Sequence, residues 1–385
     1  MLQGMRFDRL GLLLTGGGLV ALLWLPFVLF KANRILPGVP HSLFDVLTTP
    51  EALICCTVWV LVAATMLASR SSGLRLGAAS LGVIVAAWAV AAACNALTPA
   101  GNHVVRVAPA SGFWLLLVCL GLAATDALSR LRLRPGQRVL LLALVVTALG
   151  SALSLGLFDS LSMMREYAIN AERFGRELRT HLLLALGSLA AALLVAAPLG
   201  ILCHRVAGLR AGVLGALNFI QTIPAIALFG ILMAPLAALA AASSTATALG
   251  IRGIGAAPAV VALFLYSLLP IVANMVTGLG RVSPTAVLAA RGMGLTTGQI
   301  LTWVELPLAL PVILTGVRIV LLQNIGLTAL AALIGAGGLG TFIFQGIGQA
   351  AIDLVLLGAL PIISISFFAA VSLDACIESI DKVPR

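Results

Sequence analysis

The side chains that could carry out catalysis are dispersed along this sequence of 385 residues. Its four histidines lie far apart, and Ser, His and Asp never cluster as a nucleophilic site requires. The only lysines are Lys31 and Lys382, and neither lies in a G-x-x-x-x-G-K-[ST] phosphate-binding loop. The six cysteines lie in or beside apolar runs, without metal-ligand spacing. We therefore predict no catalytic residue, no metal site and no cofactor bound by this chain.

Polar side chains inside long apolar runs indicate a different kind of chemistry. A polar group is costly in hydrocarbon unless it faces a cavity or another helix. Such groups could line the path of a solute or form hydrogen bonds between helices, and the sequence favours neither reading. The candidate pathway residues are Asn218, Gln221, Thr222, Pro224, Asn274, Gln323 and Asn324.

The second candidate feature is a charged, glycine-containing segment, residues 284–307, between two apolar runs. Residues 285–293 have helical character. Small side chains on one face would let another surface approach closely. That face contains Ala286, Ala289 and Ala290.

Glycines interrupt this segment after its first helix. Gly292 and Gly294 can end the helix or turn the chain, because glycine adopts positive φ at little cost. A second helix is predicted over 297–305, and Pro307 is expected to break it before the next apolar run. A branched residue at Gly294 is expected to clash at the turn. The segment thus resembles a helix-turn-helix lever for a soluble partner.

The composition requires a membrane, because 61% of the residues are hydrophobic and only 9% are charged. Spanning helices need about 20 apolar residues each. We predict an all-α polytopic membrane protein with about ten transmembrane helices, the first a retained anchor rather than a cleaved signal peptide. The expected spans are 10–30, 53–68, 76–97, 108–127, 139–157, 182–203, 213–241, 256–276, 309–334 and 352–373.

The basic residues predict an orientation. Fourteen Lys and Arg fall on the side of the N-terminus and eight on the other side, with Arg318 at a span end. Cytoplasmic loops are enriched in these residues, so both termini and residues 284–307 are expected in the cytoplasm. The net charge of +10 then reflects topology and contact with anionic lipid, not nucleic-acid binding.

The longest polar break, residues 158–180, divides the chain into two halves. Its apolar residues recur at helical spacing, which favours an amphipathic helix on the membrane surface over a solvated loop. Asp126 and Arg130 form a predicted i,i+4 ion pair. The glycines of 335–340 predict a tight turn with close helix approach. The predicted domains are an N-terminal membrane extension (1–158), a periplasmic amphipathic segment (159–180), a five-helix core (181–375) and a cytoplasmic tail (376–385).

The second half resembles a known family, the inner-membrane permeases of ATP-binding-cassette (ABC) importers. Their cytoplasmic loop reads E-A-A, three residues, Gly, nine residues, hydrophobic-x-Leu-Pro; Ala289, Ala290, Gly294, Leu306 and Pro307 match it. Leu288 stands where the family usually has Glu. The blocks NFIQTIPAIALFG, ALFLYSLLPIVANMVTGL and TALAALIGAGGLGTFIFQGI are similar to the glycine betaine, carnitine and choline class, and the extra N-terminal spans to its long YehY-like branch.

The resemblance implies a permease of the cell inner membrane without enzymatic activity of its own. It implies a cytoplasmic ATPase partner that binds ATP and Mg, a second permease subunit, identical or different, and a periplasmic solute-binding protein. The expected solute is an osmoprotectant such as glycine betaine or choline; an amino acid is the alternative, and a secondary carrier is disfavoured by the scarcity of mid-span carboxylates. The implied ATPase-coupling residues are Leu288, Ala289, Ala290, Arg291, Gly292, Gly294, Glu305 and Pro307.

Overall fold

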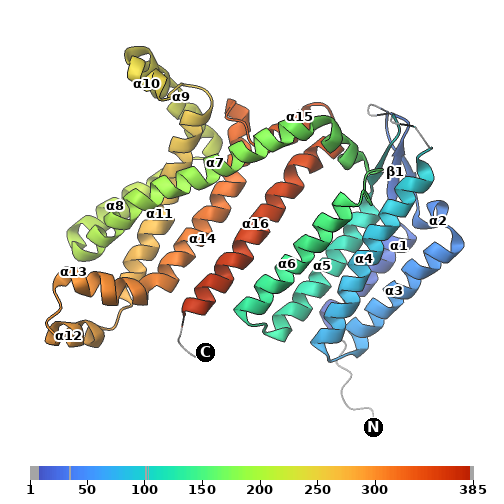
Figure 1. The fold of residues 1–385 in the computed structure, drawn as a ribbon, viewed down its shortest axis with the longest axis horizontal. Helices are drawn as coiled ribbons and strands as arrows, with labels where there is room; N and C mark the ends of the chain where they lie inside the picture. Colours follow the sequence, from blue (N-terminus) through green and yellow to red (C-terminus); the bar gives the residue numbers. More distant parts are fainter. Residues whose placement is uncertain (1–7, 34–35, 100–101, 103, 382–385) are drawn as a thin grey trace, which may run out of the picture. The chain divides into compact units, whose positions relative to one another are not determined.

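The computed structural model describes residues 8–33, 36–99, 102 and 104–381. Within these residues the chain is almost entirely helical, and nine helices are long and apolar enough to cross a membrane. The predicted all-α polytopic membrane fold is therefore confirmed (Figure 1). Arg6, Arg34, His103, Lys382 and Arg385, which contribute to the predictions from charge and from dispersed side chains, lie outside the described residues.

Contacts divide the chain into two units, Met1–Gln137 with Ala143–Ile169 and Arg138–Leu142 with Asn170–Arg385. The first unit holds α1 (Arg9–Leu23), β1 (Val28–Lys31), β2 (Val39–His41), α2 (Leu43–Val46), α3 (Thr49–Ala68), α4 (Ser72–Leu97), β3 (Arg106–Pro109), α5 (Ser111–Leu131) and most of α6 (Pro135–Ser154). Helix α7 (Ser162–Arg205) begins in the first unit and continues in the second. The second unit further holds α8 (Ala207–Thr222), α9 (Ala225–Ala242), α10 (Ser244–Ala248), α11 (Ala256–Gly280), α12 (Pro284–Gly292), α13 (Thr297–Ile300), the π-helix η1 (Leu301–Glu305), α14 (Leu306–Ala331), the 3-10 helix η2 (Ala332–Ile334), α15 (Gly340–Gly348) and α16 (Ile352–Ile380).

The predicted first span, 10–30, is wrong in its last third. Helix α1 has only 15 residues, and the apolar run continues as strand β1. Pro26 follows the helix end and has no N–H for a helical hydrogen bond. Strand β1 pairs antiparallel with β2 and β3 in a three-stranded sheet, order β2-β1-β3. An apolar run alone does not distinguish a short helix followed by a buried strand from one span.

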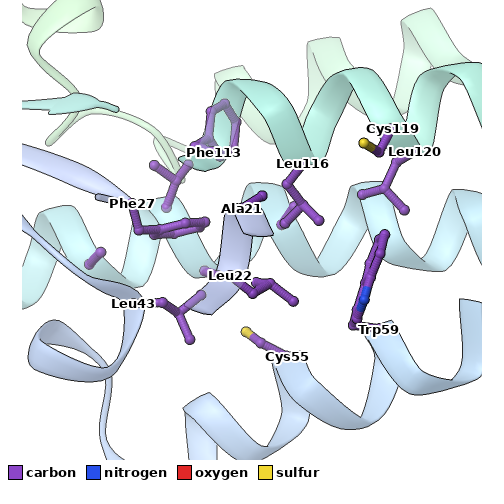
Figure 2. Close-up of a cluster of buried hydrophobic side chains, with 14 of the residues drawn as sticks. Ala21, Leu22, Phe27, Leu43, Cys55, Trp59, Phe113, Leu116, Cys119 and Leu120 are labelled. Atoms are coloured by element: carbon purple, nitrogen blue, oxygen red, sulfur yellow. The ribbon is translucent and has the colours of Figure 1, made fainter. Parts of the chain in front are cut away.

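The core of the first unit joins helices α1, α3, α4 and α5. Figure 2 shows Trp59 of α3 beside Leu120 of α5, and Phe27 close to Phe113. The rings of Phe27 and Phe113 meet edge to face, with centroids 5.9 Å apart. Gly18 of α1 leaves space for the Trp59 indole, because a Cβ there would lie 1.9 Å from the ring.

A cluster of four charges ties helix ends together in the first unit. Arg75 of α4 is buried and binds Asp8 at 2.8 Å and Asp126 at 3.4 Å, while Arg130 binds Asp8 at 3.1 Å. The predicted i,i+4 pair between Arg130 and Asp126 is confirmed at 2.9 Å. The hydrogen bond from Arg75 lowers the pKa of Asp8 below its usual value. Two acids thus compensate two guanidinium groups.

The segment predicted to lie on the membrane surface is helical but is not a separate helix. Helix α7 runs for 44 residues through Thr180 without a break. At 1.5 Å per residue it is about 66 Å long, roughly twice the hydrocarbon thickness. Residues 162–180 contain no proline that would break the helix. The amphipathic stretch is therefore the first part of the same long helix as the apolar run that follows it.

The predicted span 213–241 is also wrong as a single helix. Helix α8 ends at Thr222, and α9 begins at Ala225. Ile223 has extended backbone angles because the following Pro224 disfavours the helical conformation at that position. The span is therefore two helices joined by a bend.

Glycines allow the helices of the second unit to approach closely. A Cβ at Gly316 of α14 would lie 2.7 Å from the Asn274 Cβ on α11. The predicted tight turn in 335–340 is confirmed, since Gly335, Gly337 and Gly338 have φ angles of 75°, 81° and 87°. The turn lies at the end of the second unit opposite α12 and α13 (Figure 1).

Candidate functional site

The segment 284–307 begins as the predicted helix-turn-helix. Pro284 lies in the first turn of α12, where its missing N–H costs nothing. The chain turns at Gly294, whose φ is +82°, and its N–H donates to the Arg291 carbonyl at 2.9 Å. Helix α13 then starts with a capping box between Thr296 and Gln299.

The reason predicted for glycine at 294 is wrong in one respect. No atom lies within 4 Å of a Cβ built at Gly294, so a side chain there would not clash. The constraint is the left-handed backbone, which is costly for any residue with a Cβ and worst for a branched one. Gly292 also has open space but no positive φ.

The surface of α12 is apolar and largely exposed. Leu288 is 62% exposed and Met293 75% exposed, whereas Ala290 is buried at 1%. Ala289, Arg291 and the two glycines are exposed as well. Large apolar side chains exposed outside the spans indicate a surface that another protein covers. Leu288, where the resembling family has Glu, contributes to this apolar surface.

Pro307 does not break the second helix, so that prediction is wrong. Residues 297–334 form one continuous helical stretch of 38 residues. The π-helix η1 inserts one extra residue just before the proline, and the Leu306 N–H donates to the Leu301 carbonyl. A π-bulge shifts the hydrogen-bond register and can absorb a proline without ending the helix. The lever is therefore continuous with α14.

A buried ion pair attaches α7 to this lever. Glu305 of η1 is 4% exposed, and its carboxylate binds the guanidinium of Arg205, the last residue of α7. Glu305 was among the predicted residues, but Arg205 was not. A signal was present, because a carboxylate at the edge of an apolar run needs a cation and Arg205 ends an earlier span on the same predicted side.

The polar residues predicted inside the spans do not gather at one point. Asn324 of α14 is fully buried and donates to Ser188 of α7 and Ser267 of α11, both at 3.0 Å. Gln221 of α8 donates to the Tyr266 carbonyl at 2.8 Å. Both therefore attach to neighbouring residues of α11 and join different helices to it.

The remaining polar residues bond within their own helices or face outward. Asn274 donates to the Pro270 carbonyl at 2.8 Å, and Thr222 donates to the Phe219 carbonyl at 2.6 Å. Asn218, Thr222 and Pro224 are exposed around the bend between α8 and α9, and Gln323 is half-buried. The bend thus presents polar groups at its surface, while Asn324 lies inside the helix packing.

Two families match the chain. The family described as "ABC transporter permease YehY, N-terminal domain" matches residues 8–164. The family described as "Binding-protein-dependent transport system inner membrane component" matches residues 183–382.

Individual relatives resemble about half of the chain. The osmoprotectant import permease protein OsmW of Salmonella typhimurium is 47% identical over 182 residues, which are 47% of this chain and 80% of OsmW. The glycine betaine/carnitine/choline transport system permease protein OpuCD of Bacillus subtilis is 37% identical over 51% of this chain and 79% of its own. A chain of the inward-facing MetNI methionine ABC transporter matches 54% of this chain and 96% of its own, with 21% identity and a TM-score of 0.48.

Proposed function

The chain belongs to the binding-protein-dependent transport system inner membrane components, the permease subunits of ABC importers, and we propose that its solute is a small osmoprotectant such as glycine betaine or choline. The observation that carries the solute class is the 47% identity to OsmW over 182 residues. Several further relatives are named as choline or carnitine permeases. The permease is a transport component and ATP is hydrolysed by a separate subunit.

The proposed partners follow from this function. A cytoplasmic ATPase would bind ATP and Mg and contact the apolar surface of α12, where Leu288, Ala289, Arg291 and Gly292 are exposed. A second permease subunit would complete the pathway, and a periplasmic protein would deliver the solute. We also propose that both termini and residues 284–307 lie in the cytoplasm, because that side has the excess of basic residues.

The proposed organisation keeps the N-terminal extension apart from the permease core. The two families meet between residues 164 and 183, inside α7, which supports this division. The proposed pathway passes the bend between α8 and α9, where Asn218, Thr222 and Pro224 are exposed, while Asn324 holds α7, α11 and α14 together.

The solute class is tested by measuring ATP hydrolysis of the reconstituted chain with its ATPase and binding-protein partners. We expect glycine betaine or choline to stimulate hydrolysis several-fold over the solute-free complex. Amino acids at equal concentration are expected to give no stimulation. Stimulation by an amino acid alone would contradict the proposed solute.

We call residues 284–307 the coupling loop. Replacing Gly294 tests whether this loop couples the permease to its ATPase. The variant Gly294→Ala places a Cβ at φ +82°, which costs about 1–2 kcal/mol and disfavours the turn between α12 and α13. We expect uptake to fall roughly five- to thirtyfold, the factor to which that energy corresponds, while basal ATP hydrolysis persists. The matched control is Gly292→Ala, which has equal space and no positive φ. Equal uptake by the two variants at equal membrane levels would exclude a role for the turn in coupling.

A further inference from the structure

The end of the second unit opposite the coupling loop contains a group of polar contacts that transport alone does not explain. We define the glycine hairpin as residues 332–348, comprising η2, the turn 335–339 and α15. It joins α14 to α16, and its helix α15 has nine residues, too few to span a bilayer. Its contacts differ in kind between its two sides.

On one side the hairpin packs rigidly against α14 and α16 through backbone contacts. A Cβ at Gly340 would lie 1.9 Å from the Ala329 carbonyl oxygen of α14. A Cβ at Gly358 of α16 would lie 2.6 Å from the Leu339 carbonyl oxygen. These contacts leave no room for sliding, so the hairpin must move together with α14 and α16.

On the other side the hairpin is held to α7 by charged side chains. The Gly338 N–H donates to the Glu177 carboxylate at 2.7 Å, a charge-assisted hydrogen bond to backbone. Arg173, one turn earlier, donates to Gln345 at 2.8 Å and lies over the Phe342 ring, 5.1 Å from its centroid. The two charged groups on α7 are partly exposed, Arg173 at 37% and Glu177 at 19%, so water can solvate them when these contacts break.

Helices α7 and α14 also contact each other directly, closer to the middle of α7, through buried side chains. The His181 Nε2 lies 3.0 Å from the Ile325 carbonyl oxygen, and Asn324 bonds Ser188 at 3.0 Å. His181, Ser188 and Asn324 are all fully buried, so these contacts have no water to exchange with. Helices α7 and α14 are therefore held together at a buried crossing. The contact between α7 and the glycine hairpin lies to one side of that crossing and can open.

We propose that Glu177 and Arg173 are positioning residues that form a latch, holding the glycine hairpin against α7 until the coupling loop moves α14. This inference rests on the proposed function, since it assigns a step of the transport cycle to these residues. Residues 297–334 are one continuous helical stretch, and α14 is packed against the hairpin, so a displacement at residues 297–305 reaches the latch through α14. Opening the latch separates the ends of α7 and α14 that lie opposite the ATPase side.

The latch is tested by labelling Thr180, which lies beneath the turn. A Cβ at Gly337 would be 3.2 Å from the Thr180 Cγ2, and Thr180 is half-buried, so Thr180→Cys is partly covered while the latch is closed. The probe is a membrane-impermeant maleimide, applied to either face of vesicles containing the full-length chain and its ATPase partner. We expect Glu177→Gln to label at Thr180→Cys about fivefold faster, because a neutral acceptor forms a hydrogen bond about half as strong. A chain that retains Thr180 gives the background from the native cysteines.

The matched control is Glu172→Gln on the same helix. Glu172 is exposed and pairs with Arg176 of the same helix at 2.7 Å. In this variant, Thr180→Cys is expected to label at the same rate as in the chain that retains both Glu172 and Glu177. Arg173→Lys, which retains charge but loses the planar group over Phe342, is expected to accelerate labelling as Glu177→Gln does.

A second readout separates a latch from a purely structural contact. If the latch holds the closed state, Glu177→Gln is expected to raise ATP hydrolysis in the absence of binding protein about fivefold, and Glu172→Gln to leave it unchanged. Equal labelling of the Glu177 and Glu172 variants would overturn the proposal, as would faster labelling without a change in hydrolysis. Neither readout uses a solute, so a wrong solute class would leave both results intact.

Discussion

Replacing Arg205 by leucine is expected to reduce ATP-driven uptake at least tenfold at equal membrane expression. The substitution leaves the Glu305 carboxylate, only 4% exposed, without the guanidinium that it binds in the structure. Removing one partner of a buried ion pair costs about 3–5 kcal/mol, and the partial exposure of Arg205 reduces this to about 2–3 kcal/mol. The end of α7 then loses its attachment to η1, in the segment that we propose the ATPase moves.

The control for Arg205 is Arg210→Leu. Arg210 lies on the neighbouring helix α8, and among the described residues its guanidinium donates to the Cys203 carbonyl, at 3.4 Å. That variant is expected to retain most of its uptake, which separates loss of the ion pair from loss of positive charge. Glu305→Gln, which removes the charge and keeps the shape, is expected to lose less uptake than Arg205→Leu. Full uptake by Arg205→Leu would show that α7 does not depend on this attachment.

Among the substitutions proposed for this chain, Gly340→Ala is expected to lower the stability of the fold most. The added Cβ would lie 1.9 Å from the Ala329 carbonyl oxygen and 2.7 Å from its carbon, so two backbones must move apart. Overpacking of this kind costs about 3 kcal/mol, which corresponds to a melting temperature lower by roughly 6–12 °C. Thermal unfolding of the purified chain in detergent measures the shift.

Gly348→Ala is the matched control for Gly340→Ala. Gly348 ends the same helix α15, and no atom lies within 4 Å of a Cβ at that position. Its melting temperature is expected to differ from that of the natural chain by no more than roughly 2 °C. Equal melting temperatures for the two variants would mean that the close approach of α14 and α15 does not stabilise the fold.

The membrane fold could be predicted because the hydrocarbon core of the bilayer favours apolar side chains along the whole length of a spanning helix. A helix in the bilayer must be apolar over about 20 residues, and that pattern is visible without any tertiary contact. The same pattern failed at Val28, where an apolar stretch pairs as a strand, and at Pro224, where one stretch becomes two helices. Apolar composition specifies burial in lipid or protein but not the backbone conformation.

The turn of the coupling loop could be predicted because glycine conformational freedom is local. Gly294 adopts the positive φ that its position suggested. The π-helix before Pro307 could not be predicted, because a register shift depends on what the carbonyls of the preceding turn can reach. The pairing of Arg205 with Glu305 and of Glu177 with Gly338 joins residues 100 and 161 positions apart, and no local pattern specifies such partners.

In the proposed function, this chain transports its solute with energy from a separate ATPase. This function is tested most directly by uptake of labelled glycine betaine into liposomes that contain the chain with its ATPase and binding-protein partners. We expect uptake that requires ATP hydrolysis and persists when all ion gradients are collapsed. Uptake that follows an ion gradient and continues without ATP would contradict it.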